Sequence, residues 1–550
     1  MLAMLSHLSR RRFLQGSAAT VAAARAASMW PQNAMRIASG PFQPTWDSLK
    51  ANYKTPDWFR DAKFGIWAHW SAQCVPEQGD WYARRMYMQG DPIYEWHVKH
   101  YGHPTKFGFM EIDNLWKAEK WQPEQMMQLY QAAGAKYFFA LANHHDNFDN
   151  YASTYHPWNS TRIGPKRDII GTWEKVARAH GMKFGVSNHS SHAWHWFQVA
   201  YGYDAVGPLA NQRYDAATLT KADGKGKWWE GYDPQVLYAG RTDLAMPDGV
   251  NTIAAQNAWH KDHDGKWHEE DPPQNPHFSE LWFLRCKELF DKYNPDLVYF
   301  DDEELPFGDK GLSVTAHLYN TSVARHGSQQ AVVFAKKPGP NHMGGFTLDI
   351  ERSRSTEILA EPWQTDTCIG DWHYKRSLFE QHKYKTADTV IALLIDVISK
   401  NGNLLLSVPV RGDGSLDEDE HAFLQQLASW VPVHGEAIYG SRPWKVFGEG
   451  PPEPIEKNFS EKTRPHTAED IRFTTKGNVV YAFVLAWPTD GKVRIKSMRR
   501  GGEHTPSSIH RVEILPNTAQ LKWTQTADAL EVTMPTDKPN PYAYVLRITT

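Results

Sequence analysis

Residues 293–304 read Tyr-Asn-Pro-Asp-Leu-Val-Tyr-Phe-Asp-Asp-Glu-Glu, so that an apolar run ends abruptly in four consecutive acidic residues. The apolar residues 297–300 predict a short buried strand, which places the acidic residues at its C-terminal end. Like charges at a strand end repel one another and resist desolvation, so folding alone seldom favours them there. The stretch therefore indicates either carboxylate chemistry or a solvated acidic loop that follows a core strand.

Short apolar runs of the same kind alternate with helical patterns from about residue 44 to residue 440. This alternation is typical of repeated βα units and a parallel sheet. Further runs with strand character occupy residues 64–68, 137–142, 183–187, 331–335, 358–360 and 403–408. Seven or eight such units in about 400 residues predict an α/β fold, a (β/α)₈-like barrel of the TIM type, regular or irregular.

Two segments stand outside the repeated units. Residues 201–277 are rich in Gly, Asp and aromatic residues and have little periodicity, which predicts a long insertion into a catalytic barrel spanning residues 27–445. Within this insertion, the acidic and histidine-rich residues 260–271 match no defined metal-binding spacing and are predicted to form a solvated loop. Short alternating runs separated by turn residues follow, and they predict a C-terminal antiparallel β-sandwich over residues 446–550.

The N-terminal segment has the sequence pattern of an export signal. Ser-Arg-Arg-Arg-Phe-Leu-Gln at residues 9–15 precedes a mild apolar stretch and a small-residue site, Ala-Arg-Ala, at residues 24–26. This arrangement predicts a twin-arginine signal peptide over residues 1–26 and export of the folded protein to the periplasm or beyond. No other window holds the roughly 18 uninterrupted apolar residues of a membrane span, so none is predicted in the mature chain.

The composition limits the possible partners and cofactors. Sixty basic and 63 acidic residues leave a net charge of −3, which provides no long-range field for nucleic acid. Aromatic residues make up 13% of the chain, including 24 Trp, and flat aromatic faces suit sugar rings. The three cysteines are widely spaced and encode neither a disulfide framework nor a thiolate metal site. We therefore expect no nucleic-acid partner and no metal or other cofactor.

Polar side chains follow several predicted strands, where a parallel barrel places its active site. Such positions hold His69, His144, His145, His189, Asp301 and Asp302. Histidines beside carboxylates could bind zinc in a metal-dependent hydrolase. Against this, no His-x-His pair follows the first strand, and the adjacent His144 and His145 would point to opposite sides of a strand. The alternative is a sugar site, where one carboxylate attacks the anomeric carbon and another protonates the leaving oxygen.

Several blocks of the chain together resemble the α-L-fucosidases of glycoside hydrolase family 29. They are Lys-Phe-Gly-Ile-Trp-Ala-His-Trp at 63–70, His-His-Asp-Asn-Phe at 144–148, the run at 293–301, Pro-Trp-Gln-Thr-Asp-Thr-Cys-Ile-Gly at 362–370 and Ser-Lys-Asn-Gly-Asn-Leu-Leu-Leu at 399–406. The matching blocks run in family order from about residue 44 to residue 444. The resemblance implies an irregular (β/α)₈-like barrel followed by a β-sandwich, as the strand pattern also predicts.

The resemblance implies that Asp301 is the nucleophile of a retaining mechanism that passes through a covalent glycosyl-enzyme. Asp302 stands where relatives usually have Gly, and it is the alternative nucleophile if the register is shifted by one residue. For the general acid/base, the resemblance indicates Glu351, which lies in an Asp-x-Glu-Arg block. Glu361 and Asp366 are the alternatives. The acid/base must be partly desolvated to hold its proton near neutral pH.

The resemblance also implies a sugar pocket and a fucosylated glycan as substrate. Its candidate residues are His69, Trp81, His144, His145, His189, where relatives often have Tyr, and Trp158 at the rim. An α-L-galactosidase on the same scaffold is an alternative, because a pocket for the fucose methyl discriminates only modestly against a hydroxyl. A non-catalytic glycan-binding protein is a further alternative, which the presence of candidates for both the nucleophile and the acid disfavours.

Overall fold

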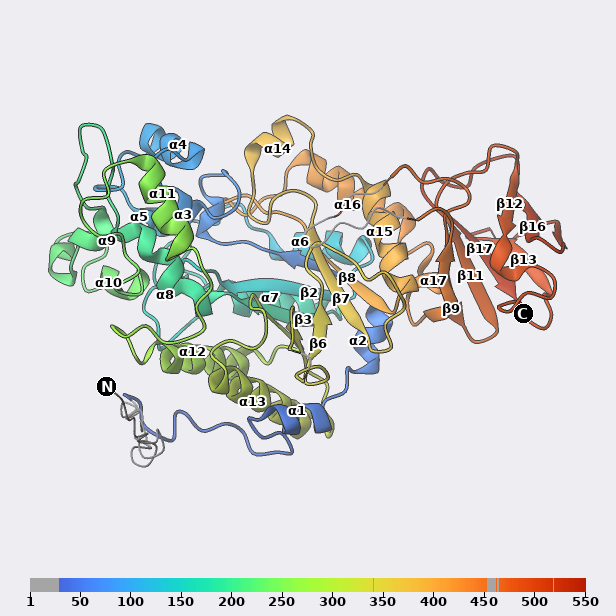
Figure 1. The fold of residues 1–550 in the computed structure, drawn as a ribbon, viewed down its shortest axis with the longest axis horizontal. Coiled ribbons are helices and arrows are strands. Elements are labelled where there is room, and N and C mark those ends of the chain that lie inside the picture. The colour runs from blue at the N-terminus through green and yellow to red at the C-terminus, as the bar shows by residue number, and fades with distance from the viewer. Residues whose placement is uncertain (1–28, 340, 453–460, 462–463, 518) are drawn as a thin grey trace, which may run out of the picture.

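The computed structural model describes residues 29–339, 341–452, 461, 464–517 and 519–550. Within them, a closed barrel of eight parallel strands is followed by a smaller domain of antiparallel sheets. Figure 1 shows the barrel strands at the centre of the molecule and the C-terminal sheets at one end. The predicted signal peptide of residues 1–26 lies outside the described residues, among which no helix is long and apolar enough to cross a membrane.

The barrel strands follow one another in chain order, and β1 closes the barrel by pairing with β8. They are β1 (Phe64–Ala68), β2 (Tyr137–Asn143), β3 (Lys183–Asn188), β4 (Leu297–Phe300), β5 (Val332–Ala335), β6 (Thr347–Asp349), β7 (Trp363–Cys368) and β8 (Gly402–Ser407). The predicted barrel is therefore confirmed, but the strand predicted at residues 358–360 is wrong, because these residues form a loop before β7. The sequence of β7 does not form an apolar run, because its buried side chains Gln364 and Asp366 are polar.

Large side chains fill the inside of the barrel, and the opposite faces of the strands pack against the helices. Gly65 makes room for this filling, because a Cβ at that position would lie 2.2 Å from the ring of Tyr137. The interior cluster includes Trp67, Tyr137, Phe139, Leu297, Tyr299, Val332, Phe334 and Leu405. The barrel is thus a packed core rather than a pore, and only its end is open to a ligand.

Helices cover the outside of the barrel. The longest are α6 (Pro123–Ala132), α7 (Ile169–Ala179), α12 (Phe278–Tyr293), α13 (Asp309–His326), α15 (Ala387–Ser399) and α16 (Glu418–Trp430). Shorter helices elsewhere in this part of the chain are α1 (Trp46–Asn52), α2 (Asp57–Ala62), α3 (Tyr82–Arg85), α4 (Pro92–His100), α5 (Phe109–Leu115), α14 (Arg376–Glu380) and α17 (Gly435–Ile438). Asp168 precedes α7, and its carboxylate accepts a hydrogen bond from the backbone N–H of Gly171 at 2.9 Å and so caps the helix.

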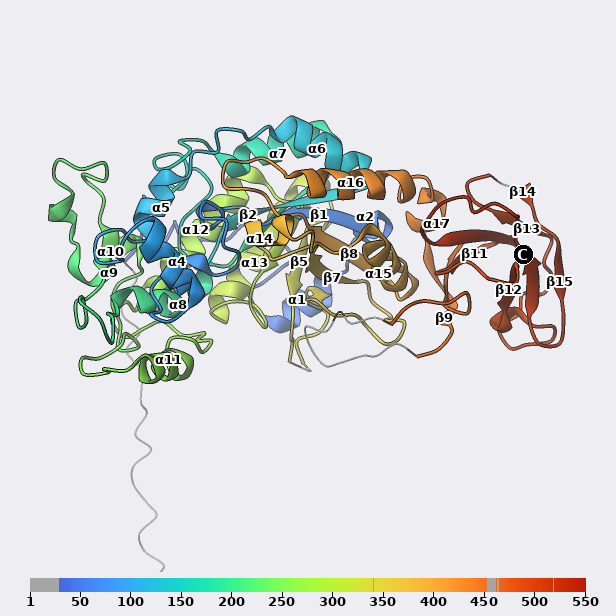
Figure 2. The same cartoon turned by 90° about the horizontal axis from the view of Figure 1, so that it is seen from above.

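The predicted insertion forms part of the long connection between β3 and α12. This connection contains the short helices α8 (Ala193–Trp196), α9 (Asp215–Thr218) and α10 (Pro234–Leu237), and also α11 (Ile253–Asp262). In both views, these helices lie at the end of the molecule opposite the C-terminal domain (Figures 1 and 2). The prediction of a solvated loop over residues 260–271 is correct only in part. Glu269 and Glu270 are exposed outside any helix, but Asp264 is buried and pairs with Arg84 at 3.1 Å and His260 at 2.9 Å.

The C-terminal domain consists of two antiparallel sheets that share one apolar core. The larger sheet has the order β14 (Ala519–Gln520), β13 (Arg511–Ile514), β17 (Tyr544–Thr549), β11 (Val479–Val484), β10 (Ile471–Lys476), β9 (Arg442–Glu449). The smaller has the order β12 (Lys492–Ile495), β16 (Leu530–Thr533), β15 (Trp523–Gln525). This sandwich architecture confirms the prediction, and β9 spans the predicted boundary between residues 445 and 446.

Candidate active site

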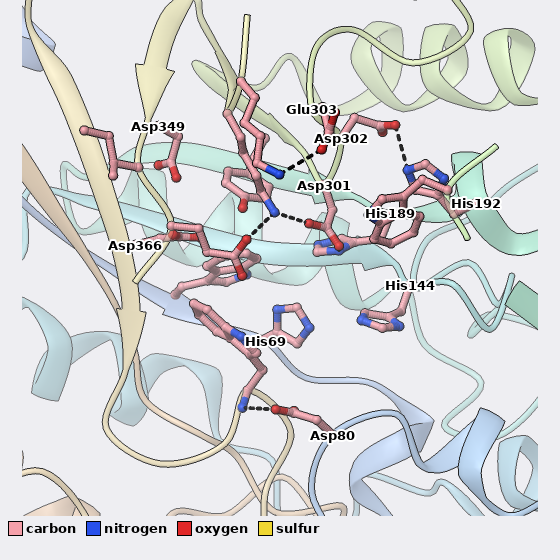
Figure 3. Close-up of a pocket in the computed structure, with 18 of the residues that line it drawn as sticks. His69, Asp80, His144, His189, His192, Asp301, Asp302, Glu303, Asp349 and Asp366 are labelled. Carbon is pink, nitrogen blue, oxygen red and sulfur yellow. Dashed lines mark hydrogen bonds and ion pairs between the residues drawn. The ribbon is translucent and has the colours of Figure 1, made fainter. Parts of the chain in front are cut away.

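A cavity of about 380 Å³ opens where the barrel strands end. Residues at or just beyond the carboxyl ends of β1 to β7 contribute to its wall, which is the expected place for the active site of such a barrel. Figure 3 shows histidines and carboxylates converging on this cavity. The lining residues that matter below are Trp67, His69, Trp81, His144, His189, His192, Trp267, Glu269, Asp301, Asp302, Glu303, Lys336, Asp349, Glu351, Asp366 and Trp372.

Asp301 is held by three side chains at the centre of the cavity. Its Oδ2 accepts a hydrogen bond from Nδ1 of His189 at 3.0 Å and lies 3.2 Å from Nε2 of His145. Its Oδ1 contacts the ammonium of Lys336. Burial favours the neutral carboxyl, but Lys336 and His189 outweigh it and hold the pKa of Asp301 well below its usual range. The site therefore contains an ionised, oriented carboxylate.

Lys336 links Asp301 to a second carboxyl group. Its Nζ lies 2.5 Å from Oε2 of Glu351, and it also contacts Asp301. Burial favours the neutral amine, but the carboxylates of Asp301 and Glu351 raise the pKa of Lys336 well above its usual value. The sequence prediction missed Lys336, although it directly follows β5 and so meets the same strand-end rule that identified Asp301.

The predicted acid/base residues lie in different environments. Glu351 and Asp366 line the cavity, whereas Glu361 is exposed and is not among the described residues that line it. Burial and the neighbouring Asp349 raise the pKa of Asp366 well above its usual range, and burial raises the pKa of Asp349 to about 7. The structure therefore brings Glu351 and Asp366 to the site and leaves Glu361 outside it.

The cavity histidines have tautomers that their hydrogen bonds define. Burial lowers the pKa of His189 to about 4, so the ring is neutral, donates through Nδ1 to Asp301 and leaves Nε2 as an acceptor. His144 accepts at Nδ1 from the amide of Gln73 at 2.9 Å, so its Nε2 carries the hydrogen. His145 donates from Nδ1 to the carbonyl of His189 at 2.7 Å.

His69 adds another polar group to the same wall. Both of its ring nitrogens are buried and have no hydrogen-bond partner among the described residues, and burial lowers its pKa well below the usual value. The indole rings of Trp67 and Trp372 both lie beside it, with centroid distances of 4.9 Å and 5.7 Å from the imidazole. A ligand with several hydroxyl groups could satisfy such unpaired nitrogens, while the aromatic rings cover an apolar face.

The three acidic residues after Asp301 all have partners. Asp302 is buried; one of its oxygens accepts a hydrogen bond from Oγ of Ser191 at 2.8 Å, and the other lies 2.7 Å from Nε2 of His192. Figure 3 shows Asp302 turned toward His192 and away from Asp301. Glu303 pairs with Lys337 at 2.8 Å, and Glu304 pairs with His342 at 3.0 Å.

Of the two tryptophans predicted for the sugar pocket, one lines the cavity and the other is buried away from it. Trp81 lines the cavity and is 43% exposed. Trp158 is fully buried, donates its indole N–H to the carbonyl of Asp233 at 2.8 Å and packs against Trp228 and Tyr232. The structure therefore does not bring Trp158 to the rim, because the insertion uses its ring for packing.

Some of these side chains are also close enough to hold a metal ion. Within the part of the chain that the structure describes, three groups have ligand atoms within 4.8 Å of one another: His69, His144 and His373; His144, His145 and His189; and His192, Glu269 and Asp302. In the second group, both nitrogens of His145 already contact protein oxygens. Only Nε2 of His144 and Nε2 of His189 remain there for a ligand. Chelation can therefore test the metal-dependent alternative.

Comparisons with known proteins agree with this geometry. The family profile described as α-L-fucosidase matches residues 29–436, and the profile of the α-L-fucosidase C-terminal domain matches residues 464–549. The chain is 26% identical to the tissue α-L-fucosidase of Mus musculus over 532 residues, which cover 94% of this chain and 96% of the mouse protein. It is 25% identical to the tissue α-L-fucosidase of Homo sapiens over 520 residues, 92% of each chain.

Solved structures show a related fold. An α-fucosidase of Thermotoga maritima in complex with a mechanism-based inhibitor superposes with a TM-score of 0.66 at 24% identity, covering 92% of this chain and 100% of that one. The same Thermotoga maritima protein in complex with fucose gives a TM-score of 0.65 at 24% identity, with 92% and 99% of the two chains covered.

Proposed function

The chain belongs to the α-L-fucosidase family and is therefore a glycosidase, and from this premise we propose that it releases terminal α-L-fucose with Asp301 as nucleophile and Glu351 as acid/base. One observation supports this pair most strongly, which is the contact of Lys336 with both carboxyl groups. Because one nitrogen contacts both groups, their nearest oxygens lie at most about 5 Å apart. That separation is typical of retaining glycosidases, whereas inverting enzymes need roughly 6.5–9.5 Å.

The first step breaks the glycosidic bond. The carboxylate of Asp301 attacks the anomeric carbon and forms a glycosyl ester, while the bond from that carbon to the leaving oxygen breaks. Glu351, as the acid, gives its proton to the leaving oxygen. His189 and His145 hold Oδ2 of Asp301, which fixes the direction of attack.

Lys336 couples the charges of the two carboxyl groups during the cycle. While Asp301 is ionised, Lys336 is shared between it and Glu351. Formation of the ester removes the charge of Asp301, so an ionised Glu351 becomes the charged partner of the ammonium. This favours release of the Glu351 proton in the first step. It also leaves a base that takes a proton from water as water attacks the anomeric carbon and frees Asp301.

His189 and His144 can bind a sugar hydroxyl group, one as hydrogen-bond acceptor and the other as donor. Nε2 of His189 is an acceptor, and Nε2 of His144 is a donor. The two rings stack with their centroids 5.0 Å apart, so a hydroxyl group that reaches both Nε2 atoms can donate to His189 and accept from His144. Trp67, Trp81 and Trp372 provide aromatic surface for the apolar part of the sugar.

Hydrolysis of 4-nitrophenyl α-L-fucoside by the chelator-treated protein tests this function. We expect full activity after dialysis against EDTA, a preference over 4-nitrophenyl α-L-galactoside, and a loss of about 10⁴-fold or more in Asp301→Ala. Azide should partly restore the variant by attacking the anomeric carbon in place of Asp301. Loss of activity with EDTA and its return with zinc would support the metal-dependent hydrolase instead. Fucose binding without any turnover would support a glycan-binding protein.

We also propose that the protein is exported folded by the twin-arginine route to the periplasm or beyond. The support is the Ser-Arg-Arg-Arg-Phe-Leu run at residues 9–14 and the Ala-Arg-Ala site at residues 24–26. Replacement of Arg10 and Arg11 by Lys should retain the precursor in the cytoplasm when cell fractions are compared. Unchanged export of this variant, or an unprocessed N-terminus in the exported protein, would contradict the proposal.

A further inference from the structure

The insertion reaches the active-site cavity through one short segment. Of the described residues in the insertion, only Trp267 and Glu269 line the cavity. Trp267 is 46% exposed and is one of the few large apolar side chains in the described part of the chain that solvent reaches to this extent. An indole ring that remains exposed in the wall of a cavity offers apolar surface to a ligand.

Trp267 rests on a buried group that begins beside the proposed nucleophile. Asp302 accepts a hydrogen bond from Ser191 and lies 2.7 Å from Nε2 of His192. The His192 ring packs against the indole of Trp267, with the ring centroids 4.0 Å apart. His145, which contacts the nucleophile, lies 5.6 Å from the same indole by centroid. Asp302 thus supports His192, whose ring packs against Trp267.

A second series of contacts fixes His192 from the side of the insertion. Nδ1 of His192 lies 3.1 Å from Nε2 of His195, whose Nδ1 donates to the carbonyl of Asp264 at 3.1 Å. The carboxylate of Asp264 pairs with the buried Arg84 at 3.1 Å. Buried and hydrogen-bonded side chains therefore support the exposed indole of Trp267.

Glu269 places a carboxyl group close to this aromatic surface. Its carboxylate, the carboxylate of Asp302 and the imidazole of His192 have ligand atoms within 4.8 Å of one another. The side chain of Glu269 lines the cavity, where its carboxyl oxygens can accept hydrogen bonds from the hydroxyl groups of a ligand. An aromatic face with an adjacent carboxyl suits a pyranose, which combines an apolar C–H face with ring hydroxyls.

We propose that Trp267 and Glu269 bind the sugar to which the fucose is attached, that is, the aglycone unit of a fucosylated glycan. The inference rests on the proposed function, because it assumes that fucose occupies the cavity over Asp301. Asp302 follows the nucleophile directly in the chain and contacts His192, which packs against the indole of Trp267. The indole surface therefore lies close to the point where the glycosidic bond breaks. A sugar that packs on Trp267 can thus remain joined to the fucose that Asp301 attacks.

Two substrates separate this role from the chemistry. An α-L-fucosyl disaccharide has an aglycone sugar, whereas α-L-fucosyl fluoride has none and needs no proton for its leaving group. We expect Trp267→Ala to lower kcat/KM for the disaccharide by about tenfold or more, mainly through KM, and Trp267→Phe to restore most of it. Hydrolysis of the fluoride should stay within about twofold of wild type in both variants.

Trp228 provides a matched control in the same insertion. It is also an exposed tryptophan, at 37%, but it is not among the described residues lining the cavity, and its indole donates to Glu111 at 2.8 Å. Trp228→Ala should leave both substrates within about twofold of wild type. An unchanged disaccharide kcat/KM in Trp267→Ala, or an equal loss on disaccharide and fluoride, would overturn the inference. A wild-type protein that hydrolyses neither substrate would instead contradict the proposed function.

Discussion

Replacing Lys336 by Met removes the cation that lies between the two proposed catalytic carboxyl groups. The side chain is 14% exposed, contacts Asp301 and lies 2.5 Å from Glu351. Met preserves most of the volume of the side chain and cannot pair with either carboxylate. The variant therefore leaves Asp301 with the hydrogen bond from His189 but without its strongest favourable charge interaction.

The expected size of the effect follows from the geometry. Two unit charges about 3 Å apart attract by roughly 5 kcal/mol at an effective dielectric constant near 20, and loss of one partner of a buried pair costs about 3–5 kcal/mol. If about 3 kcal/mol of this acts on the ionisation of Asp301, its pKa rises by about two units. Because Lys336 depresses this pKa in the wild type, its removal moves the acidic limb of kcat/KM to higher pH.

The assay is the pH profile of kcat/KM for 4-nitrophenyl α-L-fucoside. We expect the acidic limb of Lys336→Met to lie about two units above that of the wild type, so that activity is lost mainly in the window between the two limbs. Lys337→Met is the control, since Lys337 is the adjacent lysine but pairs with the exposed Glu303. An unshifted acidic limb in Lys336→Met would refute the claim that Lys336 keeps Asp301 ionised.

Three further predictions concern residues that the structure places inside or outside the site. Glu351→Gln should lower kcat/KM for a fucosyl disaccharide by about 10²–10⁴-fold, but it should not slow the first step with fucosyl fluoride, whose leaving group needs no proton. Glu361→Gln should change kcat/KM by no more than about twofold. A large loss in Glu361→Gln and none in Glu351→Gln would assign the acid to Glu361. Arg285→Met should reduce the free energy of unfolding by about 3–5 kcal/mol in urea titration, because it strands the buried carboxylate of Asp149; a change below about 1 kcal/mol would contradict this. Trp158→Phe should leave KM for aryl fucosides unchanged, and a severalfold rise in KM would return Trp158 to the pocket.

The barrel is readable from the sequence because most of its strands are buried on both faces and therefore apolar. β4 is such a case, since all four of its residues are buried and the acidic residues mark its end. β7 is the exception, because Gln364 and Asp366 are buried inside the barrel and hydrogen-bonding or charge interactions replace apolar packing there. A polar buried strand has no hydrophobic periodicity, so the strand of that unit is predicted in the wrong place.

The central part of the site follows from one rule, that side chains just after parallel strands meet at one end of a barrel. This rule places Asp301, His144 and His189 together, and the structure has them around the same cavity. The rule also applies to Lys336, which a search for carboxylates and histidines alone overlooks. It does not apply to Trp267, because the path of a long insertion depends on tertiary contacts that no local pattern specifies.

The role of Asp302 also depends on tertiary structure. Adjacent residues in an extended chain point to opposite sides, which predicts that only one of Asp301 and Asp302 reaches the sugar. The structure agrees with this prediction, because the side chain of Asp302 contacts Ser191 and His192 and is turned away from Asp301 (Figure 3). The sequence cannot identify these partners, because they lie on the connection after β3, more than 100 residues earlier in the chain.

The identity of the nucleophile can be measured directly by trapping the glycosyl-enzyme. A 2-deoxy-2-fluoro-α-L-fucosyl fluoride should inactivate the wild-type protein slowly, because the fluorine at C2 destabilises the positive charge that develops as the ester is hydrolysed. Proteolysis and fragmentation mass spectrometry of the labelled protein should then locate one fluorofucosyl group on Asp301. A label on Asp302 or on any other residue, or turnover without a trapped ester, would contradict the central claim that Asp301 attacks the sugar.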